Sequence, residues 1–306
     1  MILKAKEEMT SEIKQIWKTC FPEVDPRYVE HYFKVIYKPE NCYVNLVNNH
    51  IASTLVRNIH PFIFNGKILQ ISMLSGVCTV PEQRGKGYMR ELMDIVLDVC
   101  DHTELITLLQ ATNPSMYEGY GFRTVYNRKE ILLERKDVKR IPSLYGCQYD
   151  PKPIELLKVY SNFIKRFNGF YARDLEYFVY FKKEIIARGG KLVAYFNSKG
   201  TIMGYAVLIP ENDAMKIEEL IYLDSTSLSK LLNVALNERV SSVHLHVSEA
   251  EELQKIFPEA KYRVYPSTMA RLNDKVLFSK LFAERAETVE QVFANSRKPL
   301  NLNEFF

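Results

Sequence analysis

The feature of this sequence most able to do chemistry is a short basic glycine turn, Gln83-Arg84-Gly85-Lys86-Gly87, with an extended run before it and a helical pattern after it. Backbone N–H groups at the start of a helix point outward and together carry about half a positive charge. The glycines let an anionic group approach the backbone closely. Arg84, Lys86 and Arg90 add positive charge around that point. The pattern predicts a cradle for a diphosphate group, and the alternative interpretation is a plain sharp turn.

Two common phosphate-binding motifs do not fit this turn. A P-loop needs a glycine five residues before Gly85 and a Ser or Thr after Lys86, but Val80 and Gly87 stand at those positions. A dinucleotide-binding fingerprint needs a Gly or Ala three residues after Gly87, where Arg90 stands. That fingerprint also needs a parallel sheet, whereas the runs before the turn predict an antiparallel one. The cradle is therefore of another kind.

The elements that carry the turn predict a mixed α/β domain. Apolar residues recur at helical spacing over 10–21, and Asp25-Pro26 is typical of the start of a second helix. Asn48-Asn49 and Asn65-Gly66 join three extended runs into an antiparallel meander, the latter as a type I′ turn. After the meander, a strand, a helix and another strand follow in the order of one parallel crossover. The predicted strands lie at 42–47, 51–64, 67–80, 105–111 and 123–133, and the helices after the turn at 88–101 and 115–120.

The second half of the chain repeats this order without the glycine turn. Breaking residues cluster at 141–153, which predicts domains at 1–150, 151–270 and 271–306. The last segment predicts one or two amphipathic helices and a polar tail that ends in Phe305-Phe306. The predicted helices of the second half lie at 156–163, 175–186 and 228–236, and its strands at 191–196, 201–209, 217–223 and 243–247.

Composition and charge narrow the class of protein. Of the 306 residues 47% are hydrophobic and 25% charged, which indicates a folded chain of about two domains. The net charge of +4 is too weak to predict nucleic-acid binding. The apolar runs are too short to cross a membrane, and the charged N-terminus is unlike a signal peptide. Five widely spaced cysteines without a Cys-x-x-Cys pair indicate a reducing, cytoplasmic setting.

Two elements at this spacing resemble the GNAT acyl-CoA N-acetyltransferases. The first is the run Val77–Gly87, and the second, after Asn113, is Tyr117-x-x-x-Gly121-Phe122. The resemblance implies tandem α/β GNAT folds on a mixed sheet, the second degenerate. It implies acetyl-CoA as the acyl donor, no metal, and a primary amine or lysine side chain as the acceptor, with direct transfer of the acetyl group.

A closer resemblance, to the Eis (enhanced intracellular survival) family, covers nearly the whole chain. It rests on Leu74–Pro81 leading into Gly87–Leu92, and on the closing segment from Arg297 to Phe306. That family has two tandem GNAT domains, the second without a pyrophosphate loop, and then a sterol-carrier-like domain. Only 271–306 remains for the third domain here, so it is much reduced or absent. The family tends to form homo-oligomers, and the resemblance leaves that state open for this chain.

The resemblance also implies roles for individual residues. Backbone N–H groups near Val77–Thr79 would polarise the acetyl carbonyl, and the pyrophosphate would lie on Arg84–Met89. Tyr117 would give a proton to the departing thiolate, the alternative being a tyrosine packed beneath the donor. The implied donor-binding residues are Val77, Cys78, Thr79, Arg84, Gly85, Lys86, Gly87, Tyr88, Met89, Arg90 and Asn113.

The resemblance also implies a general base. In the Eis family it is the chain's own terminal carboxylate, which Phe306 would carry here. A base is needed because an amine with a pKa of ~10.4 must lose a proton when it attacks. Glu82, Glu118 and Glu30 are open alternatives, as is a tail without any role.

Other candidate residues do not predict a site. His244 and His246 share one face of a predicted strand, but no third metal ligand is spaced to join them. Cys78 has no neighbouring base that would make it a nucleophile. For the whole chain, a non-catalytic protein that binds acyl-CoA is the second hypothesis. The acceptor is not readable from the sequence, because family members act on aminoglycosides, polyamines or protein lysines.

Overall fold

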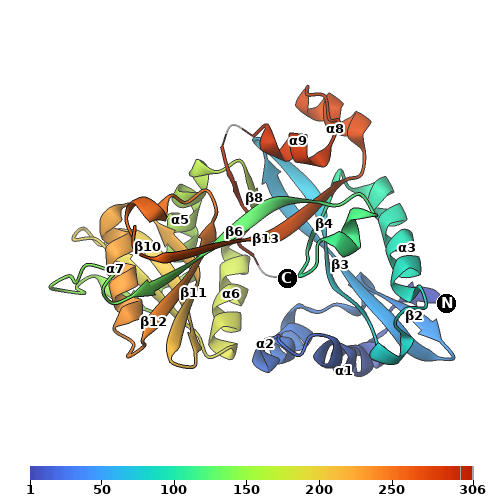
Figure 1. Cartoon of the computed structure of the whole chain (residues 1–306), viewed down its shortest axis with the longest axis horizontal. Coiled ribbons are helices and arrows are strands. Elements are labelled where there is room, and N and C mark those ends of the chain that lie inside the picture. The colour runs from blue at the N-terminus through green and yellow to red at the C-terminus, as the bar shows by residue number, and fades with distance from the viewer. Residues whose placement is uncertain (297, 305–306) are drawn as a thin grey trace. The chain divides into compact units, whose positions relative to one another are not determined.

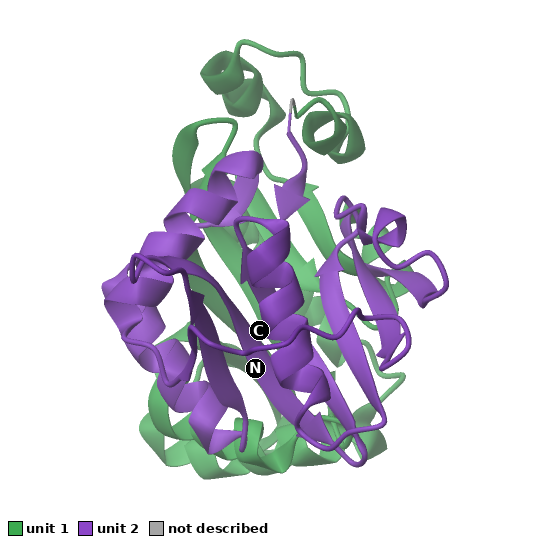
Figure 2. Cartoon of the chain, turned by 90° about the vertical axis from the view of Figure 1, so that its left-hand side faces the viewer, with its two compact units in different colours: residues 1–125, 267–296, 305–306 green, residues 126–266, 297–304 purple. Residues whose placement is uncertain are grey.

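A computed structural model describes residues 1–296 and 298–304, which fall into two compact units. The first unit holds residues 1–125 and 267–296, and the second holds 126–266 with the closing segment 298–304 (Figure 2). Each unit therefore contains a late segment of the chain as well as an early one.

The first unit is built on a sheet with the strand order β1-β2-β3-β4-β5-β13. The turns Asn48-Asn49 (φ 51° and 63°) and Asn65-Gly66 (φ 45° and 79°) have positive φ at both residues. The type I′ hairpin predicted at Asn65-Gly66 is thus confirmed. The strands are β1 (Ile2–Lys4), β2 (Cys42–Val47), β3 (His50–Phe64), β4 (Lys67–Thr79), β5 (Ile106–Gln110) and, from Ser267 on, β13 (Lys261–Leu272).

Helices cover both faces of this sheet. On one face pack α1 (Thr10–Cys20), α2 (Pro26–His31) and the π-helical turn Tyr32–Ile36, with Trp17 stacked on Tyr32. The Asp25 carboxylate caps α2, as its sequence predicts. On the other face pack α3 (Tyr88–Thr103) and α4 (Ser115–Glu118), whose core side chains include Leu92, Met93, Val96, Leu97, Cys100 and Tyr117.

Two further helices, α8 (Lys275–Phe282) and α9 (Val289–Ala294), belong to the first unit and lie beside β3 (Figure 1). Phe64 holds them there through ring contacts with Phe278, Phe282 and Phe293 at centroid distances of 6.2, 5.7 and 4.9 Å. The predicted amphipathic helices of the last segment are therefore present.

The second unit repeats the three-layer arrangement with the strand order β6-β12-β11-β10-β9-β7. Helix α7 (Ser225–Leu236) covers one face, and α5 (Pro153–Phe163) and α6 (Leu175–Ala187) cover the other. Strands β11 and β12 are parallel, which makes β11-α7-β12 the counterpart of β4-α3-β5. The strands are β6 (Arg123–Glu134), β7 (Cys147–Tyr149), β8 (Gly169–Tyr171), β9 (Lys191–Phe196), β10 (Ile202–Glu211), β11 (Ala214–Tyr222), β12 (Ser242–Ser248) and β14 (Leu300–Asn301).

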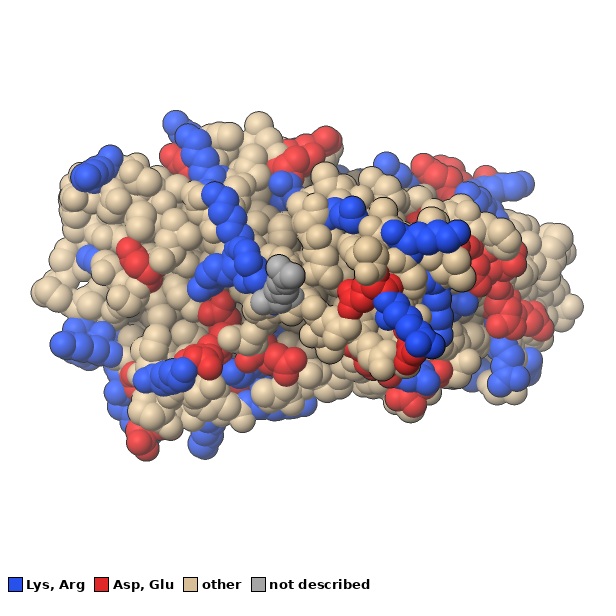
Figure 3. Space-filling view, turned by 90° about the horizontal axis from the view of Figure 1, so that it is seen from above, with Lys and Arg blue, Asp and Glu red and all other residues tan. Residues whose placement is uncertain are grey.

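The mixed α/β fold class is confirmed in both units. Sequence patterning did not predict the long strand β13 or the short strands β1, β7, β8 and β14. In the described part of the chain, no helix combines the length and the apolar character needed to cross a membrane. Basic and acidic side chains are interspersed on the face drawn in Figure 3.

Candidate functional site

Strands β4 and β5 separate before the chain reaches the glycine turn. They pair in parallel only from Ser72–Leu74 to Thr107–Leu109. The register between β4 and β3 also shifts here, which places a bulge at Gly76-Val77. Gly76 has a φ of +57°, and a Cβ at this position would collide with the Trp17 ring. The end of β4 is therefore a bent strand without a β5 partner, where a ligand can reach its backbone.

The glycine turn is open to a ligand. Gly85 and Gly87 have φ values of +76° and +89°, and a Cβ added to either would meet no atom within 4 Å. Gly87 begins α3 without any side-chain cap, so the first N–H groups of the helix point into open space. Arg84 and Lys86 are exposed beside it, and Lys86 Nζ donates to Gln83 Oε1 at 2.8 Å. The arrangement fits a pyrophosphate, which needs backbone donors and nearby positive charge.

Tyr117 lies in the one-turn helix α4 and is buried in the core beneath α3. Its ring meets Phe122 edge-on at 6.4 Å. Burial is the main cause that raises the pKa of Tyr117 to about 12, and the nearby Cys78 and Tyr120 add to the effect. The phenol is therefore protonated at neutral pH and available as a donor.

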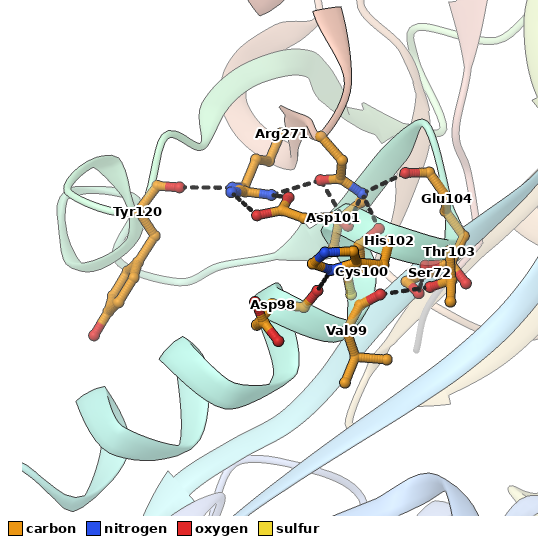
Figure 4. Close-up of polar contacts among 12 residues, drawn as sticks. Ser72, Asp98, Val99, Cys100, Asp101, His102, Thr103, Glu104, Tyr120 and Arg271 are labelled. Atoms are coloured by element: carbon orange, nitrogen blue, oxygen red, sulfur yellow. Dashed lines mark hydrogen bonds and ion pairs between the residues drawn. The ribbon is translucent and has the colours of Figure 1, made fainter. Parts of the chain in front are cut away.

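A polar clamp around Arg271 fixes the position of α4, and Figure 4 shows how its members converge. Arg271 Nε donates to the Tyr120 carbonyl at 3.0 Å, and the same guanidinium forms an ion pair with Asp101 at the end of α3. Asn273 Nδ2 donates to the carbonyls of Cys100 (3.1 Å) and Glu104 (2.9 Å). The late strand β13 thus ties the last turn of α3 to the turn after α4.

The other predicted donor-binding residues lie on β4, on α3 and after the end of β5. Val77 and Thr79 are half-buried on β4 and Cys78 is buried, while Tyr88 and Met89 are half-buried on α3. Arg90 is exposed and forms a hydrogen bond with the Tyr120 hydroxyl. Asn113 is exposed and its Oδ1 accepts from Ser115 Oγ at 2.8 Å.

Among the candidate bases the structure separates only Glu30 from the rest. Its carboxylate pairs with Lys14 and Lys18, and these hydrogen bonds lower the pKa of Glu30 to about 2. A carboxylate of that pKa is a poor proton acceptor. Glu82 and Glu118 are exposed. Phe306 lies outside the described residues.

Sequence reasoning missed two residues of this region. Arg271 is 151 positions from its partner Tyr120, and no local pattern marks it. Cys20, at the end of α1, donates from Sγ to the Thr79 carbonyl at 3.5 Å, which brings a second thiol beside the cradle.

Among the described residues of the second unit, no helix begins with an equivalent cradle. Helix α7 begins after Asp224, whose carboxylate accepts from the Ser227 N–H at 2.7 Å and so takes up a helix N–H that a phosphate would need. Arg173 forms buried ion pairs with Glu219 (2.7 Å) and with Glu304 of the closing segment (2.8 Å). Negative charge at the helix start and buried ion pairs both disfavour an anionic ligand there.

The two histidines of β12 contact other polar side chains. His244 Nδ1 lies 3.3 Å from Glu130, and His246 Nδ1 shares a 2.9 Å hydrogen bond with Tyr265. Across residues 1–296 and 298–304, no group of three or more His, Cys, Asp or Glu side chains is arranged to hold a metal ion.

Comparison with known families decides the class of this fold. An acetyltransferase (GNAT) domain family matches residues 2–125, and a second acetyltransferase (GNAT) domain family matches residues 169–272. The chain carries two GNAT acetyltransferase domains. The first GNAT domain holds the open glycine turn, and the second holds the acid-capped helix α7. Acyl transfer is accordingly the class of reaction that these domains support.

Solved structures share this fold at low sequence identity. A conserved protein from Enterococcus faecalis V583, described as a probable N-acyltransferase, has a TM-score of 0.74 at 20% identity and covers 89% of this chain and 72% of its own. A GCN5-related N-acetyltransferase from Anabaena variabilis has a TM-score of 0.73 at 18% identity, with 90% and 73% covered. Eis1 from Mycobacterium abscessus has a TM-score of 0.68 at 12% identity, with 90% and 74% covered. These likenesses concern the fold. No curated protein matches the chain.

Proposed function

We propose that this chain is an acetyl-CoA-dependent N-acetyltransferase that moves an acetyl group to a primary amine by direct transfer. The observation that carries the proposal is the coincidence, in one GNAT domain, of an open glycine turn at Gly85 and Gly87, a β4 end without a β5 partner, and the buried phenol of Tyr117. In this proposal residues 1–150 form the catalytic domain, 151–270 a second domain without a donor site, and 271–306 a segment whose tail reaches the active site.

The donor would bind through the backbone of the first domain. The pyrophosphate would lie on the N–H groups of the turn and of α3, with Arg84, Lys86 and Arg90 neutralising its charge. The bent end of β4 at Val77–Thr79 would supply a backbone N–H to the acetyl carbonyl, where such donors are typically worth ~3–4 kcal/mol in acyl transfer. Asn113 follows the end of β5, which puts it at the other side of the same opening.

Proton movement would use two groups of this chain. The Tyr117 hydroxyl, held protonated by burial, would give its proton to the departing thiolate. The α-carboxylate of Phe306 would take the proton of the amine, with Glu82 and Glu118 as the alternatives. The described part of the closing segment is anchored at Glu304 by its ion pair with Arg173.

The rival function is a non-catalytic acyl-CoA-binding protein, which would need the same cradle but no Tyr117 hydroxyl. The test is to offer acetyl-CoA with a panel of polyamines, aminoglycosides and lysine peptides and to follow release of free CoA thiol. Amine-dependent thiol release supports the transferase. Tight acetyl-CoA binding without release for any amine, at pH values from 6 to 10, would establish the rival instead.

Membership of the Eis family, a cytoplasmic setting and a homo-oligomeric state belong to the same proposal. The likeness to Eis1 supports the first through the shared fold. Size-exclusion chromatography with light scattering on the full chain tests the homo-oligomeric state.

A further inference from the structure

Two cysteine thiols lie together beside the cradle in the first unit. Cys20 ends helix α1 and is half-buried, whereas Cys78 on β4 is only 7% exposed. Cys78 Sγ lies 3.2 Å from Thr54 Oγ1, and Cys20 Sγ donates to the carbonyl of Thr79, the residue after Cys78. Cys78 belongs to the buried core cluster against which the half-buried Cys20 packs, and each thiol shifts the pKa of the other. The two thiols therefore lie beside the end of β4, which the proposed ligand would contact.

Arg84 of the glycine turn reaches the same point. Its Nε donates to the Thr79 carbonyl at 3.2 Å, the same oxygen that accepts from Cys20 Sγ at 3.5 Å. The neighbouring Cys78, and after it Arg84, lower the pKa of Cys20 to about 7 against the opposing effect of burial. Burial and the neighbouring Cys20 raise the pKa of Cys78 well above its usual value. Only the thiolate form of a cysteine is strongly nucleophilic, so the two thiols differ in reactivity.

We propose that Cys20 and Cys78 form a peroxide-sensitive thiol pair at the edge of the cradle, with Cys20 as the attacking thiol and Cys78 as the resolving thiol. A reactive, accessible cysteine beside a second thiol is the usual arrangement of a redox-sensitive site. The pair is distinct from Cys147, the half-buried cysteine of the second unit, whose pKa burial raises.

The chemistry balances with hydrogen peroxide as the oxidant. The Cys20 thiolate attacks one peroxide oxygen, an S–O bond forms, the O–O bond breaks, and hydroxide leaves and takes up a proton to become water. The Cys78 thiol then attacks the sulfur of the Cys20 sulfenic acid, an S–S bond forms, the S–O bond breaks, and the departing hydroxide takes the Cys78 proton to become a second water. Both sulfurs are oxidised by one electron each and the peroxide is reduced to two waters.

Disulfide formation would alter the cradle. The Cys20 sulfur would lose its hydrogen bond to Thr79 and its contact with Arg84, both of which position the start of the turn. We therefore expect weaker acetyl-CoA binding in the oxidised protein, and this consequence alone rests on the proposed function.

The test treats the full chain with hydrogen peroxide, blocks remaining thiols with an alkylating reagent and maps tryptic peptides by mass spectrometry. Cleavage after Lys18, Arg27, Lys67 and Arg84 places Cys20 in the peptide 19–27 and Cys78 in 68–84, each with a single cysteine. We expect a linked 19–27/68–84 peptide that dithiothreitol separates and that neither Cys20→Ser nor Cys78→Ser forms. In the untreated protein at pH 7, Cys20 should react with iodoacetamide at least tenfold faster than Cys147.

Three results would overturn the pair: no linked peptide at any peroxide dose, equal alkylation of Cys20 and Cys147, or linkage of Cys20 to added CoA in place of Cys78. None of these three measurements needs catalytic activity. They therefore test the thiol pair even if the chain is not a transferase. Binding of acetyl-CoA before and after oxidation, compared between the unaltered chain and Cys20→Ser, tests the consequence. If oxidation weakened acetyl-CoA binding equally in the unaltered chain and in Cys20→Ser, the Cys20–Cys78 disulfide would not be the cause of the weaker binding.

Discussion

Arg271 donates to the carbonyl of Tyr120 across 151 positions of sequence, and the Tyr120 N–H in turn donates to the carbonyl of Tyr117 at 3.0 Å. The same guanidinium pairs with Asp101 at the end of α3, the helix whose other end is the glycine turn. One side chain from a late strand thus joins the helix that would hold the donor to the helix that presents the proposed acid.

Arg271→Ala should lower turnover by about tenfold while the acetyl-CoA Kd changes little, because α4 loses its anchor but the cradle remains. Loss of these charge-assisted hydrogen bonds should also cost about 1–3 kcal/mol of unfolding free energy. Arg271→Lys should recover only part of the turnover, since an ammonium cannot form the two-pronged contact. Steady-state kinetics, calorimetry and urea unfolding measure these effects.

The matched control for that variant is Arg285→Ala, which removes an exposed arginine whose ion pair among the described residues is with Glu287. Arg285→Ala should leave turnover, the acetyl-CoA Kd and the unfolding free energy unchanged, because surface ion pairs contribute little to stability. If Arg271→Ala loses stability but keeps its turnover, the clamp is structural and does not position Tyr117.

Gly87→Val should abolish acetyl-CoA binding, because a branched side chain would cover the helix N–H groups. Gly66→Val is the control, since Gly66 has a similar φ of +79° and equally open surroundings but lies in the β3–β4 turn. Both substitutions strain the backbone by about 1–2 kcal/mol, so they should unfold at similar urea concentrations. Titration calorimetry that shows normal binding to Gly87→Val would place the cradle elsewhere.

Tyr117→Phe should lower turnover by about a hundredfold or more with little change in acetyl-CoA Kd, because only the hydroxyl is lost. Tyr43→Phe is a suitable control, as Tyr43 is buried in the same core cluster. Single-turnover kinetics with a fast amine measure the effect. A Tyr117→Phe enzyme at full rate would assign the tyrosine to packing, and one that no longer binds the donor would make its role structural.

Four Gly and Ser residues appended after Phe306 should lower turnover and change its pH dependence, because they move the proposed carboxylate away from the amine. Amidation of Phe306 by semisynthesis should do the same without added bulk, since it removes the charge and leaves the ring. Donor affinity is the internal control and should persist in both proteins. Unchanged rate and pH profile would direct attention to Glu82 and Glu118.

His246 should make the second unit sensitive to acid. Burial, with help from Arg128 and Lys216, lowers the pKa of His246 to about 3, against ~6.5 in an unfolded chain. The unfolded state therefore binds a proton first, and stability falls as the pH drops from ~6.5 towards 3. His246→Gln should reduce the loss between pH 7 and pH 5 by about 2 kcal/mol, measured by urea unfolding.

The features that could be predicted from the sequence are those that depend on interactions between neighbouring residues. Asn65-Gly66 forms its hairpin and Asp25 caps its helix because both effects depend on a few neighbouring residues. The glycine turn was identifiable for the same reason. Strand β13 was not, because Pro266 interrupts its pattern and proline is uncommon within a strand. Its pairing from Thr268–Leu272 to β5 depends on tertiary structure alone.

The same limit applies to the site. Arg271 and Cys20 reach it from distant parts of the sequence, and neither belongs to a motif. Spacing could group only residues on consecutive elements, such as Gly87 and Tyr117. What links these two in space is a side chain from a strand that the periodicity did not predict.

The pairing of β5 with residues 268–272 has a consequence for how the protein is made. A ribosome adds ~5–20 residues per second, so the outer edge of β5 waits on the order of ten seconds for its partner strand to be synthesised. An open strand edge is a template for pairing with another chain. Newly made first halves are thus exposed to aggregation until residues 268–272 have been synthesised, and a fragment released near residue 150 would keep that edge for its lifetime.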